Sequence, residues 1–396
     1  MFFYLSFLRP PPRTVSANAK DILITPQIAN DLRTETFEGQ VDIWCCWILE
    51  LQTGAVRQPS KKLTAWKGSS SSYKVIPIDL PSGRKAGQSW RLALWVPGRS
   101  SLSLPADVID LCPDLGSANF GTCILPVTSS PILFEQGGKK EGPKQERIWR
   151  SYALPISPPI NSVEMTSEQN DRALITIVEQ TSFDLDKKIW DSGLGLSSWL
   201  AELCRTDSTL AQSQPMAQDL KALLLSPSGF TAVELGTGIG FVSLMLSAIL
   251  EPFPGSETRR ILATDLESAI PLIEENFAFN KPHYTASLSA ATLDWEQDLE
   301  KCEALRDIGA IDLIMLADVT YNRDVFPALL RTLISLLQRG GGCTRVVMGY
   351  KQRDAAERTF WTASREMGVE LVEVGRVGGV EDSAAVEIWM ATRALS

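Results

Sequence analysis

Short apolar runs and amphipathic stretches alternate regularly along the second half of the chain. The apolar runs predict strands at 230–235, 260–265, 286–293, 311–317 and 343–350. The amphipathic stretches after them predict helices at 240–250, 268–280, 296–307, 324–339 and 354–367. Two further strands, 369–376 and 384–392, close the chain. We therefore expect an α/β fold with a Rossmann-like, seven-stranded, mostly parallel sheet that ends in an antiparallel hairpin.

The first half has a different pattern. Runs such as VDIWCCWILEL and WRLALWVPG are broken by Gly, Pro and Ser and predict a smaller β-rich domain over 21–150. Six of the eleven tryptophans lie there. We interpret them as core residues, with carbohydrate or peptide binding as the alternative. Residues 1–20 are expected to form a loose leader and 151–170 a linker, and the second domain is expected to span 171–396.

A glycine-rich turn follows the strand at 230–235. The sequence VELGTGIGF places an acid, Glu234, before Gly236, Gly238 and Gly240. A strand, a glycine turn and a helix let bare backbone approach a bound nucleoside, because no Cβ stands in the way. The dinucleotide pattern G-x-G-x-x-G/A does not fit, since residue 241 is Phe.

Polar residues also follow the next three strands. Asp265 ends the second strand, Asp294 and Trp295 follow the third, and Asp318 and Tyr321 follow the fourth. The carboxyl ends of parallel strands meet at one edge of an open sheet, where ligands bind. Each acid alone also fits a strand-end cap or a solvated loop. Acids at four successive strand ends favour a nucleoside site.

Five blocks carry a resemblance to a known family: IWDSG (189–193), VELGTGIG (233–240), ATDLE (263–267), LDWE (293–296) and ADVTY (317–321). Together they resemble the family-16 seven-β-strand protein-lysine methyltransferases, which are class I enzymes that use S-adenosyl-L-methionine (SAM). The layout is similar to that of members with a long N-terminal extension. The resemblance covers 171–396 and leaves 21–150 outside it.

The resemblance implies a role for each matched position. It assigns Trp190, Gly240 and Asp318 to the cofactor pocket, Glu234, Gly236 and Gly238 to the methionine end, Asp265 to the ribose, and Asp294 with Trp295 to the adenine. It makes Asp318 and Tyr321 the candidate catalytic residues, which flank the channel for the target side chain. Trp190 also fits a core role, and Tyr321 also fits packing under the next helix. No metal is implied.

The charge and the cysteines narrow the function classes. The net charge of −9 argues against nucleic acid as the main partner. Residues 171–396 hold 32 acids and 20 basic residues, which suits a basic substrate. Seven cysteines without a C-x-x-C motif, together with one histidine, argue against a disulfide framework and a zinc site. We expect a reducing compartment, the cytoplasm or the nucleus, and no membrane span; the sequence leaves the oligomeric state open.

The most direct hypothesis is methyl transfer from SAM to a lysine side chain of a protein, with Asp318 and Tyr321 positioning the amine. Positions 318–321 read D-V-T-Y rather than N-P-P-Y, so a nucleobase target is not expected. A protein histidine or a small molecule remains as an alternative acceptor. A further alternative is a non-catalytic scaffold that recruits a partner through the N-terminal domain.

Overall fold

The structure is a computed structural model that divides the chain into two units. The first unit contains Met1–Asp110, Thr122–Tyr152 and Thr176–Asp184, and the second consists mainly of Leu185–Ser396. The structure describes residues 2–51, 54–97, 104–111, 124–137, 141–155, 172–182, 184–212, 214–253, 259–306, 308–340, 343–378 and 385–392. No helix within these ranges is long and apolar enough to cross a membrane.

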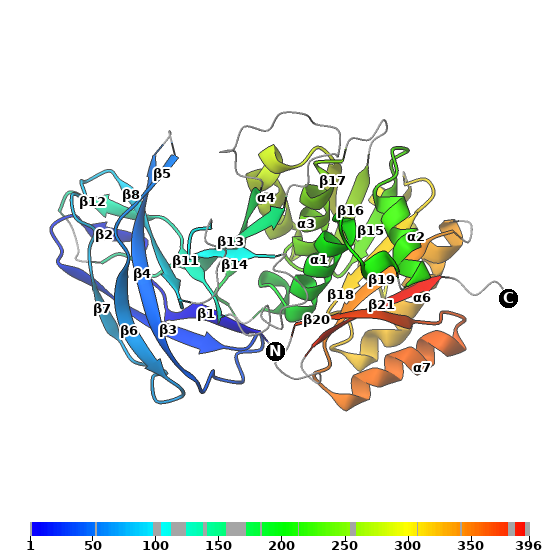
Figure 1. Ribbon diagram of the computed structural model, residues 1–396, viewed down its shortest axis with the longest axis horizontal. Helices are drawn as coiled ribbons and strands as arrows, with labels where there is room; N and C mark the ends of the chain where they lie inside the picture. Colours follow the sequence, from blue (N-terminus) through cyan, green and yellow to red (C-terminus); the bar gives the residue numbers. More distant parts are fainter. Residues whose placement is uncertain are drawn as a thin grey trace. The chain divides into compact units, whose positions relative to one another are not determined.

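The first unit is built from two sheets (Figure 1). One has the strand order β10-β1-β3-β7, and the other runs β14-β13-β11-β8-β12-β2, with β4, β5, β6 and β9 paired beside this path. The strands are β1 (Phe3–Arg9), β2 (Thr14–Ser16), β3 (Asp21–Ala29), β4 (Gln40–Leu51), β5 (Gly54–Arg57), β6 (Lys61–Lys67), β7 (Ile76–Asp79), β8 (Ser89–Trp95), β9 (Val108–Asp110), β10 (Ile124–Leu125), β11 (Val127–Ser129), β12 (Ile132–Glu135), β13 (Arg147–Pro155) and β14 (Arg172–Gln180).

Tryptophans contribute to the core of this unit. Trp47, Trp66 and Trp90 are buried in its main hydrophobic cluster. The Trp47 indole donates to the carbonyl of Asp79 at 2.9 Å, and the Trp66 indole donates to the carbonyl of Phe37 at 2.7 Å. The Trp90 indole donates to the Gln88 side chain at 3.3 Å. Because all three N–H groups are satisfied inside the unit, these three rings confirm the interpretation as core residues.

The prediction of a loose leader over residues 1–20 is wrong. β1 pairs antiparallel with β3 and parallel with β10, and its side chains Leu5 and Phe7 are buried. From Leu5 to Leu8 buried and more exposed side chains alternate, so this apolar start serves as a strand once a partner strand is available.

The second domain was expected to begin at residue 171, but the structure assigns Thr176–Asp184 to the first unit. The physical reason is that β14 lies next to β13 in the ten-stranded sheet, where its backbone hydrogen bonds are satisfied. Of the predicted linker 151–170, residues 151–155 belong to β13, and 156–170 lie outside the described residues.

The second unit contains a seven-stranded sheet of order β17-β16-β15-β18-β19-β21-β20. Its first five strands pair in parallel, and β21 pairs antiparallel with both β19 and β20. This confirms the expected Rossmann-like sheet with a C-terminal antiparallel hairpin. The strands are β15 (Thr231–Leu235), β16 (Arg260–Asp265), β17 (Ser287–Thr292), β18 (Leu313–Ala317), β19 (Arg345–Tyr350), β20 (Val372–Val377) and β21 (Val386–Thr392).

Helices cover this sheet, with α6 and α7 on the opposite side from α1 and α3 (Figure 1). The α-helices are α1 (Asp191–Cys204), α2 (Pro215–Leu224), α3 (Phe241–Leu250), α4 (Ile270–Asn280), α5 (Glu303–Arg306), α6 (Phe326–Arg339) and α7 (Thr359–Glu366). Short 3-10 turns lie at Leu185–Lys187, Leu210–Gln212, Lys281–His283, Leu299–Lys301, Arg323–Val325 and Ala355–Arg358. The helix expected over 296–307 is instead the turn Leu299–Lys301 followed by α5, because extended backbone at Cys302 separates the two.

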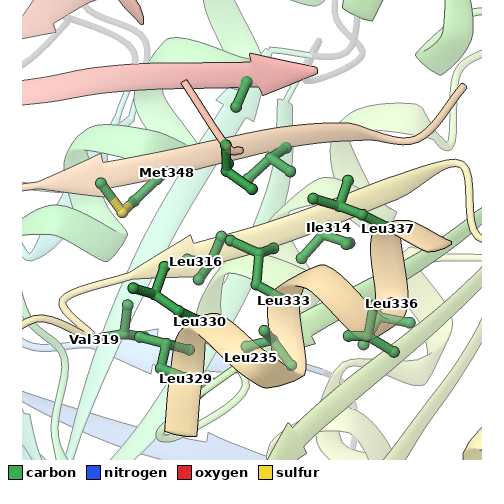
Figure 2. Packing of buried hydrophobic residues seen from close by; sticks show 14 of the residues in the cluster. Leu235, Ile314, Leu316, Val319, Leu329, Leu330, Leu333, Leu336, Leu337 and Met348 are labelled. Atoms are coloured by element: carbon green, nitrogen blue, oxygen red, sulfur yellow. The ribbon is translucent and has the colours of Figure 1, made fainter. Parts of the chain in front are cut away.

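Helix α6 shows how periodicity produces the core. Its leucines recur at helical spacing and face the strands beneath them, where Ile314, Leu316 and Met348 are buried in the same cluster (Figure 2). The leucines are Leu329, Leu330, Leu333, Leu336 and Leu337. Val319, just beyond the end of β18, belongs to this cluster and carries it to the carboxyl edge of the sheet.

Candidate functional site

The acid before the glycine turn points into the protein. The Glu234 side chain is 1% exposed, and its Oε2 accepts from Thr237 Oγ1 at 2.7 Å, Ser243 Oγ at 2.5 Å and Ser243 N at 3.0 Å. Burial raises the pKa of this carboxyl to about 7, although the hydrogen bonds from Ser243 and Thr237 act in the opposite direction. Glu234 therefore ties the turn to the first residues of α3.

The three glycines of the turn all adopt left-handed backbone but differ in their surroundings. A Cβ at Gly236 would lie 2.9 Å from Val319 and 3.1 Å from the Trp295 ring. A Cβ at Gly240 would lie 2.7 Å from Phe277 of α4, so this glycine permits close packing of two helices. A Cβ at Gly238 would meet nothing within 4 Å. Only Gly238 presents bare backbone to open space.

Asp265, at the end of β16, meets the glycine turn directly. Its Oδ2 accepts from the Gly238 amide at 2.7 Å, and its Oδ1 accepts from the Leu266 amide at 2.7 Å. Burial raises the pKa of this carboxyl. The sequence prediction that the second strand end lies beside the turn is confirmed by this contact.

Of the two candidate residues after the third strand, β17, only Trp295 points toward the glycine turn. Asp294 Oδ1 accepts from the Glu296 amide at 2.9 Å, and its Oδ2 accepts from the Gln297 side chain at 3.1 Å, so the acid caps its own turn. Trp295 instead reaches across to Gly236. Its indole N–H is buried and has no hydrogen-bond partner among the described residues.

Asp318, after β18, is held in an unusual conformation. Its φ of 55° is left-handed, a region that few non-glycine residues occupy. Its side chain is 7% exposed and forms an ion pair with the Arg353 guanidinium through Oδ1. Its Oδ2 accepts from the Ser192 amide at 2.9 Å. This candidate catalytic acid is thus tied to α1 and to the loop after β19.

The two aromatic candidates lie at the surface of the same edge. Trp190 precedes α1 and is half-buried, with the Lys188 ammonium 4.2 Å and the Arg353 guanidinium 5.2 Å from its ring centroid. Tyr321 is 58% exposed, which does not fit the alternative of packing under a helix. Partial burial of its hydroxyl, followed by the negative charges of Asp265 and Asp186, raises its pKa.

The end of the fifth strand also contributes, and sequence reasoning missed it. Lys351 and Arg353 follow β19 directly, and Lys351 pairs with Asp191, which is fully buried in the first turn of α1. The sequence does contain a signal for them, because the two cations of KQR stand directly after an apolar strand, at a carboxyl end like the other four. The ion pair with Lys351 also gives a structural role to Asp191, the aspartate of the IWDSG block.

The edge as a whole offers features that suit a nucleoside. Among the described residues, no group of three His, Cys, Asp or Glu side chains is placed to hold a metal ion. Gly238 presents its backbone to open space, and the carboxylate of Asp265 lies beside it. The assignment of individual residues to the methionine, ribose and adenine groups stays a prediction.

Comparison with known proteins agrees with the resemblance found in the sequence. A family model described as lysine methyltransferase matches residues 169–367, which is half of the chain. The chain is 26% identical over 181 residues to the protein-lysine N-methyltransferase EFM6 of Saccharomyces cerevisiae, a match that covers 44% of this chain and 67% of that protein. It is 29% identical over 139 residues to the protein N-lysine methyltransferase METTL21A of Danio rerio, covering 35% of this chain and only 57% of that protein.

Among solved structures, the N-methyltransferase NodS of Bradyrhizobium japonicum in complex with S-adenosyl-L-homocysteine has 19% identity and a TM-score of 0.31, covering 48% of this chain and 94% of that one. The family match itself spans the glycine turn, all four predicted strand ends and the loop after β19. The chain therefore belongs to the lysine methyltransferase family, whose methyl donor is S-adenosyl-L-methionine.

Proposed function

We propose that this chain transfers a methyl group from SAM to a lysine side chain of a protein. The observation that carries the proposal is the contact between Gly238 and Asp265, in which a carboxylate lies 2.7 Å from the amide of a glycine whose Cβ position is open. Membership of the lysine methyltransferase family indicates the class of reaction, which is methyl transfer to lysine. The excess of acids in residues 171–396 supports a basic protein substrate.

The proposed roles follow from where each side chain points. When bound, SAM would supply a methyl carbon on a sulfonium; the lysine nitrogen would attack this carbon in line, and the neutral thioether of S-adenosyl-L-homocysteine would leave. Gly238 and Asp265 bind the nucleoside, and Trp295 covers one side of it. Glu234 shapes the turn from beneath, because its Oε2 is already bound to Thr237 and Ser243.

Tyr321 and Asp318 are proposed to act at the opening for the target. A lysine amine is neutral in only about one of 2,500 molecules at pH 7, so a partly buried slot that lowers its pKa raises the reactive fraction. Tyr321 is exposed at this edge and lines the approach. Asp318 orients the first turn of α1 there through its bond to the Ser192 amide. Solvent takes up the proton.

The test is to incubate the purified chain and methyl-labelled SAM with protein extract from its own host. The labelled protein and residue are then identified by mass spectrometry. We expect label on lysine. Label on histidine or on a small molecule would replace the proposal with one of the other acceptors, and SAM binding without any transfer would favour a scaffold.

A matched pair of variants sharpens this test. Asp318→Asn keeps the shape, and asparagine tolerates left-handed backbone, so the variant is expected to fold. We expect it to lower the rate of transfer on the order of 100-fold while SAM still binds. The control is Asp312→Asn, at the opposite end of β18, where the carboxylate accepts from the Thr231 amide at 2.8 Å. Labelling by Asp318→Asn at the wild-type rate would remove Asp318 from the mechanism.

The proposal carries two further expectations, one about the partners of the chain and one about its location in the cell. We expect no nucleic acid as a main partner, since the chain has a net charge of −9, and no membrane partner, since the sequence has no apolar run of about 18 residues. We expect the chain in the cytoplasm or the nucleus, where free thiols persist. In support, the described cysteines Cys45, Cys46, Cys204 and Cys302 are free and buried, and Cys343 is free and exposed.

A further inference from the structure

The fixed conformation of Asp318 depends on a residue far from it in the chain. Arg353 lies 35 residues later and forms an ion pair with Asp318 Oδ1. Left-handed backbone is sparsely populated by non-glycine residues, and although aspartate visits it more readily than most, Asp318 is fixed there by surrounding contacts. The Asp318 backbone N–H donates to the Gly349 carbonyl at 3.4 Å, and its side chain contacts the Arg353 guanidinium through one oxygen and the Ser192 amide through the other.

Arg353 is itself held in place by its own loop. Its backbone N–H donates to Glu357 Oε2 at 3.2 Å, and the same carboxylate oxygen accepts from the Tyr350 hydroxyl at 3.0 Å. Glu357 is buried, as is Tyr350 at the end of β19. The backbone of Arg353 is therefore held by Glu357. Its guanidinium contacts Asp318 and also lies 5.2 Å from the ring centroid of Trp190.

A second ion pair also joins the first turn of α1 to the end of β19. Lys351 pairs with the fully buried Asp191 in the first turn of α1. Gly349, two residues earlier, lets the helix approach closely, because a Cβ there would lie 2.7 Å from the Ser192 carbonyl oxygen. The start of α1 is therefore bound to the end of β19 independently of Arg353, and loss of Arg353 need not detach the helix.

We propose that Arg353 is a positioning residue for methyl transfer, which holds Asp318 and Trp190 at the opening where the target side chain enters. The inference rests on the proposed function. It assigns to Arg353 no contact with the reacting atoms. Its contribution is to keep the Asp318 carboxylate on the Ser192 amide and the Trp190 ring in a fixed place.

The experiment compares Arg353→Gln and Arg353→Lys with the wild-type chain. The dependence of methyl incorporation into host protein extract on SAM concentration gives an apparent maximum rate and KM. Calorimetry gives the Kd for SAM. We expect Arg353→Gln to lower the maximum rate about 10- to 100-fold, with the Kd changed less than about threefold. Arg353→Lys is expected to recover part of the rate, because it keeps the charge but loses the planar fork.

Hydrogen exchange gives a readout that does not need activity. In Arg353→Gln the amide of Ser192 should exchange about tenfold faster, since its acceptor is no longer held. The matched control is Arg345→Gln at the other end of β19, which removes a two-bond ion pair with Asp219 at 2.6 and 2.8 Å. It should leave both the transfer rate and the Ser192 exchange unchanged.

Three results would overturn the inference. The first is a wild-type rate and a wild-type Ser192 exchange in Arg353→Gln. The second is a parallel loss of SAM affinity and thermal stability in both Arg353 variants, which would make the residue merely structural. The third is a wild-type chain that labels no protein, which refutes the proposed function and with it any role of Arg353 in transfer; the control and the exchange data identify which of the three occurred.

Discussion

Each unit of the molecule contains a buried arginine–carboxylate pair, and the two pairs are built for different purposes. In the first unit Arg150 and Glu179 are bonded at 2.8 Å, with side chains 2% and 5% exposed. In the second unit Arg353 and Asp318 form a similarly enclosed pair. The chemistry is the same, but the remaining bonds of each pair go to different partners.

Arg150 uses its other donors on backbone within its own unit. Its guanidinium donates to the carbonyls of Leu5, at 3.0 Å, and of Pro126. Asp318 instead uses its second oxygen on the first turn of α1, beside the glycine turn and the other strand ends. A buried ion pair is therefore no sign of a functional site by itself; its position at the carboxyl edge of the sheet makes the difference.

The largest effect is expected for Arg150→Met. Removal of the cation leaves the Glu179 carboxylate buried without its guanidinium, which costs about 3–5 kcal/mol of folding free energy. Hydrogen-exchange mass spectrometry on the full chain should show lost protection in β1, β13 and β14, while β15 and β16 stay protected. The double variant Arg150→Met/Glu179→Gln should recover part of the loss. Unchanged protection in β13 would show that the pair does not stabilise this unit.

Glu234 extends the comparison to a buried carboxylate that accepts hydrogen bonds from hydroxyl and amide donors instead of pairing with an arginine. The pKa of Glu234 is raised from its usual 4.5 to about 7, so the folded state binds its proton more tightly than the unfolded state does. Its contribution to stability is thus present below pH 4.5 and is lost as the pH rises through 7. Glu234→Gln keeps an acceptor for Thr237 and Ser243 but does not titrate.

The measurement for Glu234 is the unfolding free energy of wild type minus that of Glu234→Gln, from denaturant titrations at several pH values. The difference should fall by on the order of 3 kcal/mol between pH 4 and pH 8. A difference that stays constant, or that rises with pH, would contradict the raised pKa.

The last comparison separates two glycines of one turn, Gly238 and Gly240, whose expected effects fall on different measurements. Alanine at either Gly238 or Gly240 carries a cost of about 1 kcal/mol for left-handed backbone. Gly240→Ala adds about 1–3 kcal/mol, because its methyl group would lie 2.7 Å from Phe277 and 2.9 Å from Ile273 in a packed core. Gly238→Ala adds no clash within the protein but fills the proposed nucleoside cradle.

We therefore expect opposite rankings for the two glycine variants in two measurements. Thermal unfolding should show Gly240→Ala as the less stable variant, and calorimetry with SAM should show Gly238→Ala as the weaker binder. Equal SAM affinity in Gly238→Ala and wild type would contradict the proposed contact with the cofactor.

The local pattern of the sequence was enough to determine the α/β unit and the edge where the candidate site residues lie. The predicted strand 260–265 is β16 with the same bounds, and the predicted contact between the second strand end and the turn is the bond between Gly238 and Asp265. Such features follow from residues close in the chain and from the rule that parallel strands end at one edge.

Only the tertiary structure decided which side chains at that edge face one another. Asp294 turns back to its own loop, Glu234 lies beneath the turn, and Asp318 is bound by an arginine 35 residues away. It also decided that the first residues form β1, because β3 and β10 supply its partners. The physical reason is the same in each case: a side-chain oxygen or a strand edge is satisfied by donors from distant segments, and no local pattern specifies which segment the fold brings beside it.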